Sequence, residues 1–203
     1  MGNARFVSGY PIHPDETPQR IRDLKKGQHP FAVVVSCSDS RIPPELIFDQ
    51  GLGDIFTIRT AGNVIGDYEL GSIEYAVEHL HCKLVVVLGH ESCGAIQAFL
   101  DRDGEKHGLK HHDHIEKILD YLANEKEEQT VRSRLASQPD LAVRANILHG
   151  VHLIQNSTPD LAPKIANRSL NVMGAYYDMD NGKVRFYDTL TLKAQINSNS
   201  AKK

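Results

Sequence analysis

Two short segments of the chain concentrate the side chains best suited to bind a metal ion. Cys37 opens the sequence Cys-Ser-Asp-Ser-Arg, and His90 and Cys93 lie in Gly-His-Glu-Ser-Cys-Gly. Two thiolates and one imidazole are a typical ligand set for zinc. Three protein ligands leave the fourth tetrahedral position open, as in catalytic zinc sites, whereas structural sites are closed by four. The sequence therefore predicts one catalytic zinc ion held by Cys37, His90 and Cys93.

Asp39 and Arg41 alternate with serines in the first segment. The sequence alone is compatible with three roles for this pair. A carboxylate that a guanidinium keeps ionised could accept a hydrogen bond from water on the metal. The pair could instead be a salt bridge that only braces the loop. Asp39 could also occupy the fourth zinc position itself, which would close the site.

The segments around these residues predict an α/β fold. Continuous apolar runs at 31–36 and 83–88 are typical of strands buried on both faces and hence parallel. Apolar residues at helical spacing alternate with such runs, which indicates a mainly parallel central sheet flanked by helices. A turn at Asp180-Asn181-Gly182 makes the last strand an antiparallel edge strand near the C-terminus. The other strands are expected at 55–59, 170–177 and 183–187, and the helices at 43–48, 68–79, 93–100, 115–122, 141–155 and 159–166.

This arrangement places the two metal-binding segments at one edge of the sheet. Ligands of open α/β sheets bind beyond the carboxyl ends of the strands. Cys37 follows the first predicted strand and His90 follows the third, while Cys93 begins a helix whose N-terminus favours the thiolate form. Taken singly, each cysteine is also compatible with a buried, inert thiol, and His90 with a structural histidine.

We expect one zinc-dependent catalytic domain over residues 31–190, with an N-terminal arm over 1–30 and a C-terminal tail over 191–203. The chain has 203 residues, 40% of them hydrophobic, which is enough for one core. The arm is polar and rich in proline, with a short helix that begins near Thr17.

Composition and charge exclude several classes of protein. The 23 Lys and Arg against 26 Asp and Glu give a net charge of −3, which argues against binding nucleic acid through a basic surface. No apolar run approaches the ~20 residues of a membrane-spanning helix, so no membrane association is expected. The sequence begins without the apolar segment of a signal peptide, which favours a cytoplasmic location. An earlier removed leader and a periplasmic location stay open.

Taken together, the motifs resemble those of the β-class carbonic anhydrases. The likeness runs from about residue 3 to 188 and includes, besides the two segments above, Pro43-Pro44-Glu45, Asp49-Gln50-Gly51-Leu52-Gly53-Asp54, Arg59-Thr60-Ala61-Gly62-Asn63 and Val172-Met173-Gly174-Ala175-Tyr176-Tyr177-Asp178. The resemblance implies reversible hydration of CO2 to bicarbonate and a proton, by attack of zinc-bound hydroxide. It also implies a homodimer, in some members assembled into a homotetramer, with active sites near the subunit boundary.

The same resemblance assigns roles around the zinc ion. Zinc lowers the pKa of bound water to roughly 7. Asp39 accepts the hydrogen of the hydroxide, and Arg41 keeps Asp39 ionised and off the metal. Because CO2 is uncharged, its pocket should be apolar, and we expect Gly94, Val64 and Ile65 to contribute to its wall.

Other functions stay open on the sequence alone. A thiol-dependent transferase or redox enzyme would use Cys93 as its nucleophile, but it leaves Cys37 unexplained. A zinc-dependent sensor would have no use for Asp39 and Arg41 beside an open metal position. A related enzyme acting on CS2 or COS would share the zinc ligands.

Two further features are expected to have no role in catalysis. The histidines at 107, 111, 112 and 114 could bind a second metal, but we expect a solvated loop. Cys82 precedes an apolar strand and is expected to be a buried thiol that binds no metal.

Overall fold

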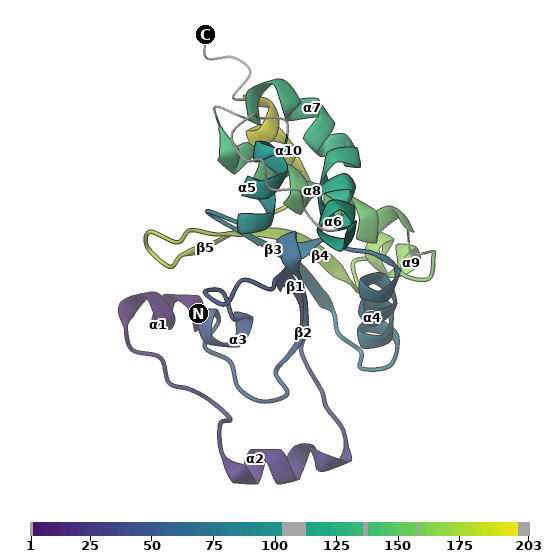
Figure 1. The fold of residues 1–203 in the computed structure, drawn as a ribbon. Helices are drawn as coiled ribbons and strands as arrows, with labels where there is room; N and C mark the ends of the chain where they lie inside the picture. Colours follow the sequence, from purple (N-terminus) through teal and green to yellow (C-terminus); the bar gives the residue numbers. More distant parts are fainter. Residues whose placement is uncertain (1, 103–112, 136–137, 158, 199–203) are drawn as a thin grey trace.

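The computed structural model of the chain describes residues 2–102, 113–135, 138–157 and 159–198. Their five strands form one sheet in the order β2-β1-β3-β4-β5 (Figure 1). The strands are β1 (Ala32–Cys37), β2 (Ile55–Thr60), β3 (Leu84–His90), β4 (Asn171–Tyr177) and β5 (Val184–Tyr187). Neighbouring strands are parallel except β4 and β5, which are antiparallel. The predicted fold class is therefore confirmed.

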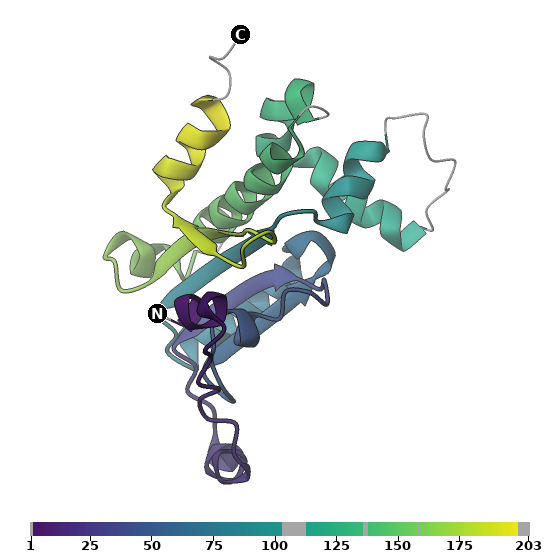
Figure 2. The same cartoon turned by 90° about the vertical axis from the view of Figure 1, so that its left-hand side faces the viewer.

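Helices pack on both faces of this sheet. α8 lies along β3 and β4 with α10 beside it, whereas α1 and α3 lie on the opposite side (Figures 1 and 2). The α-helices are α1 (Gly2–Ser8), α2 (Pro18–Asp23), α3 (Pro44–Ile47), α4 (Asp67–Glu78), α5 (Gly94–Asp101), α6 (Asp113–Asn124), α7 (Lys126–Leu135), α8 (Pro139–Ser157), α9 (Ala162–Ala166) and α10 (Thr189–Ser198), with 3-10 turns η1 (Leu24–Lys26) and η2 (Ala61–Asn63). None of the helices in these described ranges is long and apolar enough to cross a membrane.

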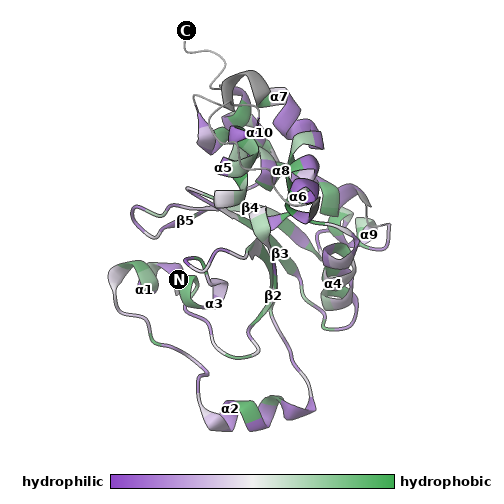
Figure 3. Ribbon diagram, viewed as in Figure 1, coloured by the Kyte–Doolittle hydropathy of each residue, from purple (hydrophilic) through white to green (hydrophobic). Residues whose placement is uncertain are grey.

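The central strands form the hydrophobic core (Figure 3). All of β1 is buried, and so is β3 apart from its first residue. Val87 of β3 lies against α8, while Leu84 and Val86 face the side where α1 lies. Both faces are covered, which explains why these strands read as continuous apolar runs without alternation.

Two glycines let α8 approach the sheet closely. A Cβ on Gly89 of β3 would lie 2.6 Å from Ile147 Cγ1, and a Cβ on Gly174 of β4 would lie 2.7 Å from Ile147 Cγ2. Any larger residue at either position would push α8 away from the strands. This close packing fixes the distance of α8 from the strand ends that carry the predicted metal ligands.

Helices α7 and α10 were not predicted from the sequence pattern. The segment expected as a tail from residue 191 begins inside α10, where Leu192 and Ile196 are 1% and 3% exposed. These two side chains, four residues apart, lie on one face of the helix, which packs on α8, β4 and β5. The apolar residues of this segment, at 190, 192, 194 and 196, alternate with polar ones, and such a pattern does not predict a helix.

A buried carboxylate helps to fasten the N-terminal arm to the domain. Asp49 forms an ion pair with Arg5 and accepts hydrogen bonds from the backbone N–H groups of Ile12 (3.1 Å) and His13 (3.0 Å). Asn3 extends the contact, because its side chain bonds to the backbone of Gly182 at the β4–β5 turn. The arm therefore adopts a defined position although most of its side chains are exposed.

Candidate metal centre

Three elements bring the predicted ligands together at the carboxyl edge of the sheet. Cys37 ends β1, His90 ends the neighbouring strand β3, and Cys93 caps the N-terminus of α5. Their ligand atoms all lie within 4.8 Å of one another, and the two Sγ atoms are 3.9 Å apart. All three side chains are buried, and both cysteines are free thiols. The group could therefore hold one metal ion.

The hydrogen bonding of His90 leaves one ring nitrogen for a metal. Its Nδ1 lies 2.8 Å from the carbonyl oxygen of Glu91, which can only accept, so Nδ1 carries the hydrogen. Nε2 then presents a lone pair, and it is buried without a hydrogen-bond partner among the described residues. A metal-binding histidine commonly donates its other N–H to a carbonyl or carboxylate in this way. Two cysteine sulfur atoms and the free lone pair of His90 Nε2 are a set of ligand atoms that fits zinc.

The two thiols influence each other strongly. The hydrogen bond from Cys93, aided by the backbone N–H of Gly62 at 3.3 Å, lowers the pKa of Cys37. The pKa of Cys93 is raised in turn, because its thiol donates its hydrogen to Cys37; burial and repulsion between two thiolates raise it further. A metal cation bound between the two sulfur atoms would favour the loss of both protons.

Asp39 is held next to this group by Arg41. Arg41 Nε donates to Oδ1 at 2.9 Å and Nη2 donates to Oδ2 at 2.7 Å, a bidentate arrangement. These bonds lower the pKa of Asp39 to about 2. Asp39 Oδ2 lies 4.0 Å from His90 Nε2, yet Asp39 is not part of the compact group of ligand atoms. The geometry favours an ionised carboxylate beside the metal position rather than on it.

Residues to which the sequence analysis gave no role support the centre. Arg59 donates to the carbonyl oxygens of Cys37 (3.0 Å) and Asp39 (2.6 Å) and so shapes the loop after β1. Asn146 of α8 donates to the carbonyl of Gly62 at 2.7 Å. Gly62 has φ +67°, which favours glycine, and this conformation aims its N–H at Cys37. Arg59 lies within a recognised motif, but nothing in the sequence of α8 marks Asn146 as a contact of this loop.

Relatives of known class share both this sequence and this fold. The family model described as carbonic anhydrase matches residues 32–184. A crystal structure of a β-carbonic anhydrase from Aspergillus fumigatus superimposes with a TM-score of 0.72 at 32% identity, covering 89% of this chain and 88% of that one. The chain belongs to the β-class carbonic anhydrases. CO2 hydration is the general activity of that family, so the predicted class of enzyme is confirmed.

Other carbonic anhydrases match over a similar length. Carbonic anhydrase 2 of Mycobacterium tuberculosis is 39% identical over 189 residues, which are 92% of this chain and 88% of that protein. The carbonic anhydrase of Mycolicibacterium smegmatis is 39% identical over 185 residues, 90% and 87% of the two chains. Tetrameric β-carbonic anhydrases of Sordaria macrospora give a TM-score of 0.71 at 27% identity, with coverage of 88% and 90%.

The residues predicted to line a CO2 pocket occupy different environments. Gly94 begins α5 next to Cys93, and Val64 is partly buried. Ile65 is 1% exposed and packs towards Gly150 of α8. A cavity of about 160 Å³ adjoins Cys93, but none of the three predicted residues lines it. Their role in substrate binding stays a prediction for this carbonic anhydrase.

Cys82 and His114 are not part of this centre. Cys82 is 3% exposed, and its thiol donates to the carbonyl of Pro30 at 3.2 Å. His114 is exposed on α6. The other histidines of the run, at 107, 111 and 112, lie outside the described residues.

Proposed function

We propose that this carbonic anhydrase hydrates CO2 reversibly to bicarbonate and a proton at one zinc ion per chain, with Cys37, His90 and Cys93 as the ligands. The observation that carries the proposal is the buried, unpartnered Nε2 of His90, which shares a 4.8 Å group with two thiols. Bound there, zinc would supply a Lewis acid that lowers the pKa of water to roughly 7.

The Asp39–Arg41 pair prepares the nucleophile. An ionised carboxylate can only accept hydrogen bonds, so Asp39 accepts the hydrogen of the attacking oxygen and leaves a lone pair directed at CO2. Arg41 occupies both carboxylate oxygens and keeps Asp39 off the metal position. Since its pKa is about 2, Asp39 stays ionised at every pH at which the enzyme works.

The direct test is metal removal. We expect fast CO2 hydration in stopped flow above about pH 8, because a water pKa of roughly 7 would leave most of the nucleophile ionised there. The activity should disappear after zinc is removed with a chelator and return when zinc is restored. Undiminished hydration by the metal-free protein would contradict the proposal, and so would an inactive protein with one zinc per chain.

We further propose that the enzyme is a homodimer, with a homotetramer as a higher assembly. Large apolar side chains of the arm are exposed in the single chain, including Tyr10 (80%), Ile12 (64%) and Ile21 (61%). On the same side of the sheet, Phe31 is 55% exposed and Phe186 is 48% exposed, and both line an apolar cavity of about 330 Å³. Exposed apolar surface of this extent is typical of a subunit interface.

The substitution Phe31→Asp tests this interface. Because Phe31 is already half-exposed, the single chain should still fold, while a charge in the interface should oppose assembly. We expect self-association to weaken at least about 30-fold, the effect of losing one interface hot spot of ~2 kcal/mol. Sedimentation velocity over a concentration series measures it. Leu190→Asp, at a 78% exposed position on α10, is the matched control. Unchanged assembly of the Phe31 variant would contradict the proposal.

A further inference from the structure

Two glutamates without a role in the proposed reaction are buried where α6 meets α7. Glu125 lies between the two helices and Glu128 in the first turn of α7, and each is 1% exposed. None of their four carboxylate oxygens has a hydrogen-bond partner among the described residues. An unpaired, ionised carboxylate in such a place is strongly unfavourable, so both groups are neutral in the folded enzyme.

Among the described residues, the charged groups that act on the pair are acids, which oppose ionisation. Burial raises the pKa of Glu128 to about 9 and raises that of Glu125 as well, and the neighbouring Glu127 adds to both effects. Tyr121 of α6 also lies close enough to feel the charge of Glu125. Within the described part of the chain, the groups acting electrostatically on Glu125 and Glu128 are therefore acids.

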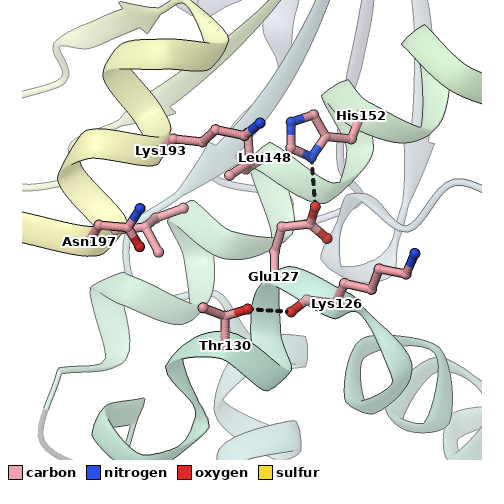
Figure 4. Close-up of a pocket in the computed structure, with 8 residues that line it drawn as sticks. Lys126, Glu127, Thr130, Leu148, His152, Lys193 and Asn197 are labelled. Atoms are coloured by element: carbon pink, nitrogen blue, oxygen red, sulfur yellow. Dashed lines mark hydrogen bonds and ion pairs between the residues drawn. The ribbon is translucent and has the colours of Figure 1, made fainter.

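Two histidines nearby bond to Glu127 instead. Glu127 accepts hydrogen bonds from Nδ1 of His149 (2.9 Å) and Nδ1 of His152 (2.6 Å), both on α8. Figure 4 shows the His152 contact, with Lys126 and Lys193 around the same pocket. These hydrogen bonds overcome the effect of burial and lower the pKa of Glu127, so it stays ionised. The fixed negative charge of Glu127 makes ionisation of the buried pair still less favourable.

The end of α6 connects this pair to the metal centre. Tyr121 donates from its hydroxyl to the carbonyl of Ile65 at 2.8 Å. Leu122 packs at Gly62, where a Cβ would lie 3.9 Å from Leu122 Cδ1. Gly62 in turn donates its N–H to the thiol of Cys37. The last turn of α6 therefore holds the loop 61–65 in the position from which it reaches a predicted zinc ligand.

We propose that Glu125 and Glu128 make the junction of α6 and α7 a pH-sensitive switch that positions the loop 61–65. While both carboxyls are protonated, the junction stays closed and Tyr121 and Leu122 support the loop. When either group loses its proton to solvent, the carboxylate must reach water, so the junction opens and the support is lost. The effect on catalysis rests on the proposed zinc-dependent function, whereas the opening itself does not.

The direction of the pH dependence follows from proton binding. The closed junction binds more protons than the open one, because the pKa of each carboxyl is raised only when it is buried. The closed junction is therefore favoured at low pH, and the population of the open junction increases as the pH rises. At pH values between the ordinary pKa of glutamate and its raised pKa in the closed junction, each ionising carboxyl increases the ratio of open to closed junction by up to about tenfold per pH unit.

The double variant Glu125→Gln/Glu128→Gln tests the switch, because glutamine has the size of glutamate and cannot ionise. Amide hydrogen exchange of the zinc-loaded enzyme, corrected for the intrinsic effect of pH, is measured over α6, α7 and residues 61–65. In the wild type we expect protection to fall at least tenfold between about pH 7 and pH 10. The double variant should keep its protection over that range. The matched control Glu74→Gln, at a half-buried glutamate of α4, should behave like the wild type.

Two further readouts keep the proposal testable if the double variant folds poorly. Carbon-13 NMR of the wild-type glutamate carboxyls should show a group titrating near pH 9, which is absent in Glu128→Gln. CO2 hydration by the wild type should decline above about pH 9 relative to Glu128→Gln. Protection independent of pH in the wild type, or equally pH-dependent in the glutamine variants, would overturn the switch. Because exchange and titration do not require turnover, failure of the zinc proposal would be seen separately.

Discussion

Replacement of Cys37 by serine is expected to empty the metal centre and abolish most of the CO2 hydration. A serine hydroxyl stays protonated near neutral pH and is a poor ligand for zinc, so only His90 and Cys93 would be left. Changes to outer-shell partners alone lower metal affinity or activity by about 10–100-fold, so loss of a ligand should lower kcat/KM at least about 10³-fold. Zinc per chain by mass spectrometry and stopped-flow rates measure the two effects.

Cys82 provides the matched control for this change. It is buried as Cys37 is, but its thiol only donates to the carbonyl of Pro30, a bond that a serine hydroxyl can also form. Cys82→Ser should therefore retain one zinc per chain and the rate of the wild type. A Cys37→Ser enzyme that still holds a full zinc ion would show that the ligand assignment is wrong.

The clustering of the three candidate ligands could be predicted because strand ends are strongly marked in this sequence. β1 and β3 are buried on both faces and therefore appear as uninterrupted apolar runs. Their parallel register pairs Ser36 with Leu88, so Cys37, one residue further along β1, and His90, two residues further along β3, lie at the same edge. In both strands, a residue with a metal-binding side chain follows the apolar run and lies at the site. Because this pattern is local, it can be found in the sequence without knowledge of the fold.

The contacts that support the site depend on tertiary packing and left no local pattern. Asn146 and Glu128 lie on helices where polar residues normally face water, yet they are 2% and 1% exposed. Asn146 is buried because α8 sits close over the glycines of β3 and β4 and meets the carbonyl of Gly62. Glu128 belongs to α7, which has no apolar stripe that would predict a helix or its buried face. Only the assembled fold shows that these residues lie inside.

Asp39→Asn separates metal binding from the chemistry. Asparagine has almost the same shape, but its amide is neutral and carries two donors, so it can no longer act purely as an acceptor next to the attacking oxygen. Zinc should stay at one per chain, because Asp39 lies outside the compact ligand group. Loss of a group that manages a proton in the transition state lowers rates by about 10²–10⁴-fold, and we expect kcat/KM to fall within this range.

The outcome of Asp39→Asn distinguishes the three interpretations of the Asp39–Arg41 pair. If the variant keeps its zinc but loses most of its rate, Asp39 acts as an acceptor for the attacking oxygen. If it keeps both its zinc and its rate, the Asp39–Arg41 salt bridge only stabilises the loop. Weakened zinc binding would instead make Asp39 a ligand that closes the site. The control Asp160→Asn, an exposed aspartate, should change neither quantity. Because the pKa of Asp39 is about 2, the Asp39→Asn substitution should lower the rate by the same factor at pH 6 and pH 9. An effect of the Glu125–Glu128 pair should instead grow as the pH rises.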